Sequence, residues 1–139
     1  MTDQPLDYDP LKVPTRPAAT VMLLRDATQG GIEVFMMRRT AAAVFAASQY
    51  VFPGGKVDDA DHASLVEPWC DGRTDASSSG LLQVPAGGLS YWVAAIRECF
   101  EEAGVLLARP SESAGVVSFD DVDVARRFGE HRNEMNAGR

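Results

Sequence analysis

Three glutamates crowd one short segment of this 139-residue chain, at a spacing that suits a metal site. Glu98, Glu101 and Glu102 follow Arg97 in "RECFEEAGVLL" and occupy positions i, i+3 and i+4. Residues so spaced share one face of a helix, where like charges repel by roughly a few tenths of a kcal/mol per pair. A divalent cation would convert this repulsion into attraction, because carboxylate oxygens are the ligands that Mg²⁺ and Mn²⁺ prefer. The segment therefore predicts a metal site that could bind a phosphate oxygen and activate water.

A solvated acidic face on a surface helix is the alternative interpretation of the same residues. Such a face needs no special stabilisation, because the repulsion between its charges is small. The formal net charge of −7 is compatible with both interpretations. It does argue against nucleic acid and anionic membranes as partners, since both carry negative charge.

The glutamates need a helix to position them, and the sequence predicts one over Tyr91–Ala103. Ser90 is a suitable N-cap residue, and Gly104 is a suitable residue to end the helix. The apolar residues fall on the arc opposite the glutamates: Trp92, Val93, Ile96, Phe100 and Ala103. We expect Trp92, Ile96 and Phe100 to be buried and the three glutamates to face a common cleft.

Short apolar runs predict strands on both sides of this helix. Residues 18–25 and 32–39 flank the turn-forming segment 26–31 and predict a hairpin. Residues 50–55, "YVFPGG", predict a brief strand that ends at the glycine pair. Residues 105–108, "VLLA", predict a buried strand. A second helix is expected from about Asp120, with an apolar stripe on one side: Val124, Phe128 and Met135.

Residues 62–89 have little periodicity apart from a possible short helix around "HASLVEPW". The stretch "DGRTDASSSG" offers little apolar surface to offset the entropy of ordering. We therefore expect a loop insertion at about 62–89 that forms a mobile or poorly packed flap. The first 17 residues contain four prolines and predict an irregular arm ahead of a domain over 18–139.

Composition is ordinary for a globular protein, with 45% hydrophobic and 24% charged residues. No apolar run is long enough to cross a bilayer, and the N-terminus lacks the layout of a signal peptide. Cys70 and Cys99 have no metal-binding or redox spacing, so a reduced, cytoplasmic location is expected. Cys99 is interpreted as a small core residue.

The stretch Arg97–Val105 resembles the second half of the Nudix box, and its letters would coincide by chance on the order of once in 10⁷ positions. The first half of the box departs from the pattern. Gly55 and the acid at Asp61 have its internal spacing, but residues 62–96 then separate Asp61 from Arg97. These are thirty-five residues where the family has seven. The box thus resembles one that is split by an insertion.

Two segments, "YVFPGGKVDDAD" and "AAIRECFEEAGVLL", resemble the interrupted-box branch of Nudix hydrolases, typified by acyl-coenzyme A diphosphatases. The resemblance implies an α/β fold, a Nudix-type α/β/α sandwich on a mixed sheet. It implies hydrolysis of a diphosphate linkage in a nucleoside diphosphate derivative, with coenzyme A or acyl-coenzyme A as the first expectation. The alternatives are an ADP-ribose or NADH diphosphatase and a nucleotide-binding regulator without catalysis.

The resemblance also assigns roles to individual residues. It implies Mg²⁺ or Mn²⁺ held by Glu98, Glu101 and Glu102, with the backbone of Gly55 close to the metal or phosphate. Glu98, Glu101 and Arg97 are the implied catalytic residues: one glutamate orients or deprotonates water, and the arginine braces the carboxylates.

Other candidate residues have competing interpretations. Arg38 and Arg39 are candidate substrate-phosphate ligands, with surface arginines at a strand end as the alternative. Asp61 is a candidate for the glutamate slot of the first half-box. His62 lies among aspartates and could suggest a second metal, although acidic loops are usually only solvated.

Relatives of this family continue after the box with further strands and a helix. Because the chain has one predicted strand and one helix after Gly104, we expect it to be completed by a C-terminal segment or a second copy. The expected interface comprises Val105–Ala108 and the apolar stripe of Val124, Phe128 and Met135.

Overall fold

The computed structural model describes residues 12, 14–40, 48–110 and 115–138. It confirms the α/β class. The strands are β1 (Ala18–Thr20), β2 (Leu24–Asp26), β3 (Ile32–Val34), β4 (Met37–Arg38), β5 (Tyr50–Val51) and β6 (Gly54–Lys56). The helices and helical turns are η2 (Asp59–Asp61), α1 (Ala63–Val66), η3 (Glu67–Trp69), α2 (Asp75–Leu82), α3 (Gly88–Glu98), η4 (Cys99–Ala103) and α4 (Val122–Asn136).

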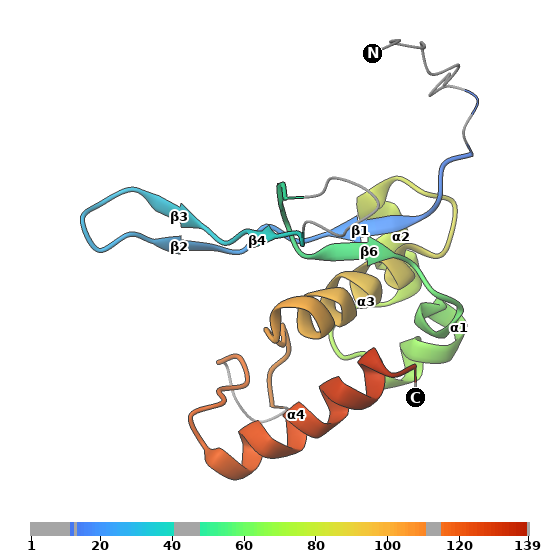
Figure 1. Ribbon diagram of the computed structural model, residues 1–139. Coiled ribbons are helices and arrows are strands. Elements are labelled where there is room, and N and C mark those ends of the chain that lie inside the picture. The colour runs from blue at the N-terminus through green and yellow to red at the C-terminus, as the bar shows by residue number, and fades with distance from the viewer. Residues whose placement is uncertain (1–11, 13, 41–47, 111–114, 139) are drawn as a thin grey trace, which may run out of the picture.

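The strands described here form antiparallel pairs: β1 with β6, β2 with β3, and β4 with β5. The predicted hairpin is confirmed for β2 and β3, which pair Leu24 with Val34 and project away from the helices (Figure 1). The first expected strand is interrupted at residues 21–23, and its earlier part, β1, pairs with β6 instead. The glycine pair therefore belongs to a strand, whereas the sequence predicted that the strand would end there.

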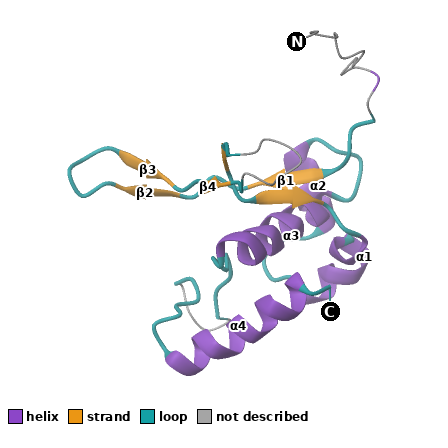
Figure 2. Ribbon diagram, viewed as in Figure 1, coloured by secondary structure: helices purple, strands orange, loops and turns teal. Residues whose placement is uncertain are grey.

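Helix α3 is the centre of the fold. It lies against the β1–β6 pair, with α1 and α2 beside it (Figures 1 and 2). Cys99 and Phe100 are buried, as the sequence predicted, together with Ala94. The expected burial of Trp92 is wrong, because the residue is 36% exposed and the guanidinium of Arg73 lies 4.4 Å from its ring centroid. Ile96, also expected to be buried, is only half-buried.

Helix α3 begins three residues before the predicted Tyr91, and its N-cap is Gly87 with φ 79°. Ser90 is not the cap, because its hydroxyl accepts a hydrogen bond from the amide of Ala63 instead. The carboxylate of Asp75, on α2, accepts hydrogen bonds from the amides of Gly87 and Leu89. These bonds lower the pKa of Asp75 below its ordinary value, so its negative charge holds the first turn of α3 at neutral pH.

Much of the segment 62–89 is helical and its helix α2 packs against α3, so the expectation of a poorly packed loop is wrong. The short helix near "HASLVEPW" is present as α1 and η3, but α2 was not expected. Thr74 caps α2 by accepting a hydrogen bond from the amide of Ser77. The small residues Ser78 and Ser79 are buried against α3, which is why a stretch without large apolar side chains still packs.

The segment after the box differs from its prediction. Residues 105–108 are irregular, and the carbonyl of Ala108 accepts a hydrogen bond from the amide of Val117. The second helix is confirmed as α4, capped by Asp121. Phe128 packs edge-on against Phe100 at a centroid distance of 6.4 Å, so the stripe that was expected to form an interface contacts this chain's own core. Among the described residues, no helix is long and apolar enough to cross a membrane.

Two glycines give a matched test of the contact between α2 and α3. A Cβ on Gly88 would stand 2.6 Å from the backbone carbon of Ser78, whereas one on Gly80, within α2, would meet open space. We expect Gly88→Ala to lower the free energy of unfolding by about 1–3 kcal/mol through overpacking. Gly80→Ala should raise it by about 0.4–1 kcal/mol, because alanine favours helix. Urea denaturation of both variants measures this, and equal effects would contradict the tight α2–α3 contact.

Candidate functional site

Arg97 lies at the centre of an acidic cluster and uses all of its N–H donors. Its Nε and Nη2 donate to the two carboxylate oxygens of Asp61, at 2.9 and 2.8 Å. Its Nη1 donates to Glu98 at 3.0 Å and to Glu101 at 3.1 Å. The remaining Nη2 proton goes to the carbonyl oxygen of Lys56, at 3.0 Å. A guanidinium has five N–H donors in a fixed plane, so this arrangement sets the positions of three carboxylates at once.

Asp61 joins the two halves of the interrupted motif. It lies on η2, its side chain is only 2% exposed, and its carboxylate also accepts a hydrogen bond from the amide of Asp58. A buried carboxylate needs a paired cation, and Arg97 supplies it across thirty-six positions of sequence. The inserted helices lie between Asp61 and Arg97 in the sequence, but they fold so that these two residues are in contact.

Two glutamates of the cluster lie along strand β6. Glu102 accepts a hydrogen bond from the amide of Gly54 at 3.0 Å. The carboxylate of Glu98 lies where a side chain on Gly55 would be: a Cβ there would stand 2.7 Å from its Oε2. Gly55 is thus required for the close approach of Glu98 to the strand.

A local change of helix type places the last two glutamates. After Glu98 the chain leaves the α-helix and forms the π-helical turn η4, which ends at Gly104 with φ 71°. Single π-helical turns are frequent at functional sites, because they redirect the side chains that they carry. Here the turn carries Glu101 toward Arg97 and Glu102 toward Gly54. The sequence predicted a continuous α-helix and therefore missed this feature.

The cluster is partly buried, and this affects the charges within it. Hydrogen bonding to Asp61 raises the pKa of Arg97 above its ordinary value, so Arg97 remains a cation. Burial raises the pKa of Glu98; the Arg97 guanidinium opposes this, and the carboxylates of Glu101 and Glu102 add to it. Repulsion among the three glutamates, predicted from their spacing, is thus present at Glu98, but burial is the main cause of its raised pKa.

Other candidate residues lie outside this cluster. Arg38 is on β4 and Arg39 directly follows it; both are exposed, and neither side chain makes an ion pair with the described residues. His62 is the C-cap residue of η2, where its backbone amide donates to the carbonyl oxygen of Asp59. The burial of Cys99 at 0% exposure confirms that it is a core residue.

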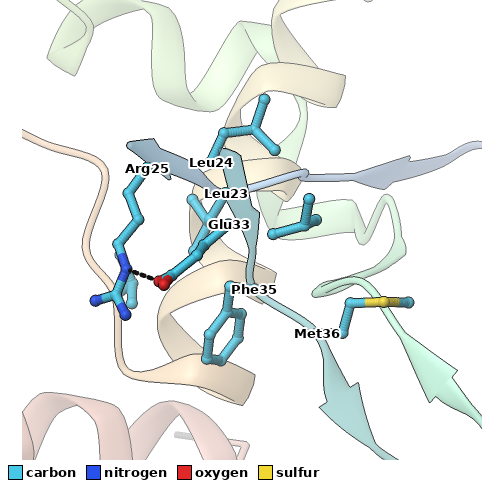
Figure 3. Close-up of a pocket in the computed structure, with 8 residues that line it drawn as sticks. Leu23, Leu24, Arg25, Glu33, Phe35 and Met36 are labelled. Carbon is cyan, nitrogen blue, oxygen red and sulfur yellow. Dashed lines mark hydrogen bonds and ion pairs between the residues drawn. The ribbon is translucent and has the colours of Figure 1, made fainter. Parts of the chain in front are cut away.

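A cavity of about 500 Å³ lies along the β2–β3 hairpin, away from the cluster. Figure 3 shows its labelled residues, with the ion pair between Arg25 and Glu33 on one side and Met36 on the other. Its lining is mostly apolar, and the two charged groups neutralise each other. This cavity therefore lacks converging polar groups, and the acidic cluster is the better candidate for chemistry.

The cluster fits a divalent cation in its ligand chemistry. As the side chains lie, the described residues contain no group of three acids, cysteines or histidines that forms a ready metal cage. Glu98, Glu101 and Glu102 each have one carboxylate oxygen committed to Arg97 or Gly54 and a second that takes no hydrogen bond from the described residues. Carboxylate oxygens of this kind are hard ligands suited to Mg²⁺ or Mn²⁺.

The comparisons with known proteins identify the family. The sequence model of the NUDIX domain matches residues 14–135, so the chain belongs to the Nudix family. It is 31% identical over 107 residues to the acyl-coenzyme A diphosphatase NUDT19 of Gallus gallus. That match covers 60% of this chain and 28% of NUDT19.

The fold is also similar to a solved structure, a NUDIX hydrolase from Alicyclobacillus acidocaldarius. The TM-score is 0.54 at 26% identity, and the match covers 83% of this chain and 50% of that one. The chain thus spans half the length of the solved protein and less than a third of the curated relative. The family model and the similar fold together identify this chain as a member of the Nudix family, whose hydrolases generally use divalent metal ions.

Substitutions at two adjacent glycines test the stability of the fold and the position of Glu98 separately. A Cβ on Gly54 would stand 2.8 Å from the backbone Cα of Thr20, so Gly54→Ala should destabilise the protein by about 1–3 kcal/mol. On Gly55 it would meet only the end of the Glu98 side chain, which can rotate. Gly55→Ala should therefore unfold near the parent temperature, and its crystal structure should show the Glu98 carboxylate turned away from β6. A Glu98 left in place would refute the proposed role of Gly55.

Proposed function

We propose that this chain hydrolyses a diphosphate linkage in a nucleoside diphosphate derivative, with Mg²⁺ or Mn²⁺ held by Glu98, Glu101 and Glu102. The observation that supports this most is the convergence of these carboxylates and Arg97 on the glycine backbone of β6. The bound cation would neutralise charge on the diphosphate and lower the pKa of a water molecule.

The chain's own residues have distinct parts in this proposal. Arg97, held by Asp61, binds one carboxylate oxygen of Glu98 and one of Glu101, and the second oxygen of each takes no hydrogen bond from the described residues. The amide of Gly54 does the same for Glu102. One of the three glutamates would orient or deprotonate the attacking water. Addition of water across the P–O–P bridge then gives two phosphate products.

Coenzyme A or acyl-coenzyme A is the proposed substrate, on the strength of the split motif and the similarity to a protein named as an acyl-coenzyme A diphosphatase. ADP-ribose and NADH are the competing substrates, because the cluster would bind the diphosphate, which all of these molecules contain, and not the groups attached to it. Arg38 and Arg39 remain candidate phosphate ligands, since their exposed side chains are free to meet a substrate.

The proposed domain covers residues 18–139, and a cytoplasmic location remains a prediction. Completion by further polypeptide or a second copy also remains a prediction. The exposed apolar surface that such a partner would bury differs from the interface expected from the sequence. The exposed apolar residues include Leu24, Ile32 and Val34 of the hairpin, at 57%, 68% and 47% exposure. Exposed apolar strands of this kind are usually covered in a stable assembly.

Glu101→Gln tests the catalytic proposal. It keeps the shape of the side chain and an acceptor for Arg97, but removes one negative charge from the cluster. We expect hydrolysis to fall by orders of magnitude, roughly 100-fold or more, with an unchanged circular dichroism spectrum. Glu130→Gln, a matched change on the exposed side of α4, should hydrolyse at the parent rate.

The assay should compare coenzyme A, acetyl-coenzyme A, ADP-ribose and NADH, with Mg²⁺, with Mn²⁺ and with excess chelator. Coenzyme A substrates should give 3′,5′-ADP and the matching phosphopantetheine, separable by chromatography. Equal rates for Glu101→Gln and the parent chain, or activity in chelator, would refute the metal site. Turnover of ADP-ribose or NADH alone would refute the substrate assignment and leave the metal site standing.

A further inference from the structure

Arg132, on α4, contacts the end of the helix that carries the glutamates. Its Nε donates to the carbonyl oxygen of Glu101 and its Nη2 to that of Glu102, each at 3.0 Å. Asn136, one turn later, approaches the carbonyl of Glu101 at 3.5 Å. No local sequence pattern indicates this contact, because its partners are at least thirty positions apart.

The last carbonyls of a helix have no partner within the helix, and they form the negative end of its dipole. An arginine at this end satisfies them by hydrogen bonds and by charge. Here the two carbonyls belong to the residues whose side chains reach Arg97 and Gly54. A group that fixes this backbone therefore also fixes the positions from which the side chains of Glu101 and Glu102 extend.

The surrounding residues are arranged to bring Arg132 to this place. Phe128, one turn earlier on the same face of α4, packs against Phe100 and against Phe119, with ring centroids 6.4 and 5.7 Å apart. Gly104 leaves room for the guanidinium, since a Cβ there would stand 3.2 Å from Nη1 of Arg132. Its positive φ and this clearance both favour glycine at the position.

We propose that Arg132 is a positioning residue for the acidic cluster. It holds the π-helical turn by two backbone carbonyls, so that Glu101 lies against Arg97 and Glu102 lies on β6. Its effect on catalysis rests on the function proposed above, but its effect on the position of Glu102 does not. Helix α4 thus serves the site without contributing a group to the reaction.

The amide of Gly54 reports on this role in the protein without metal or substrate. It lies on β6, a different element from α4, and donates to the carboxylate of Glu102. If Arg132 positions Glu102, Arg132→Ala should raise the hydrogen-exchange rate of the Gly54 amide about tenfold or more. The amide of Val57, which donates to Pro17 at the β1–β6 pair, should keep its rate and serves as the internal reference.

Three further variants make the result decisive. Glu102→Ala should produce the same change at Gly54, and Arg126→Ala, which removes a charge from the exposed side of α4, should produce none. Arg132→Lys keeps the charge and folds even where alanine does not, but it lacks the fork that reaches two carbonyls. It should give an increase smaller than that of alanine.

Unchanged exchange at Gly54 in Arg132→Ala, a parent-like rate in Arg132→Lys, or an equal rise at Val57 would each overturn the proposal. For whichever substrate the parent chain hydrolyses, kcat should fall at least tenfold in Arg132→Ala with KM unchanged. If the parent hydrolyses no substrate, the proposed function fails, and the exchange rates still decide the role of Arg132.

Discussion

The site depends on one cation, the guanidinium of Arg97, placed among carboxylates that would otherwise repel one another. Asp61 is almost wholly buried, so it requires this partner; breaking a buried pair by removing one member costs about 3–5 kcal/mol. The same guanidinium donates a hydrogen bond to one carboxylate oxygen of Glu98 and to one of Glu101. A single side chain thus connects the stability of the domain to the geometry of its acidic cluster.

This constraint explains how an interrupted motif can still form one site. The inserted residues build α1 and α2 against α3, with Asp75 holding the first turn of α3 and small residues at the contact. They therefore support the helix that they precede in sequence. At the other end of that helix, α4 covers Phe100 and contacts the last carbonyls. The helical segment α3–η4, which carries the three glutamates, is thus held at its first turn by Asp75 and at its last carbonyls by α4.

The sequence predicted the parts of the site that depend on local spacing. Glu98 and Arg97 are neighbours on one helix, and Gly104 ends it, so short-range rules were sufficient. The pairing of Asp61 with Arg97 depends on how the insertion folds, which no local pattern encodes. The same limit applies to the serine-rich α2, because serines predict a loop unless a close helix contact requires small residues. Exposure of Trp92 likewise depends on its tertiary surroundings, here the guanidinium of Arg73.

Nitrogen-15 NMR of the arginine side chains tests the central claim most directly. If Arg97 donates all five protons, rotation of its guanidinium is restricted, and Nη1 and Nη2 should give separate, slowly exchanging signals in the protein without metal. Arg126, on the exposed face of α4, should give one averaged signal. Asp61→Asn should merge the Arg97 signals, because it removes the charge that holds them. A single averaged Arg97 signal in the parent protein would contradict the account.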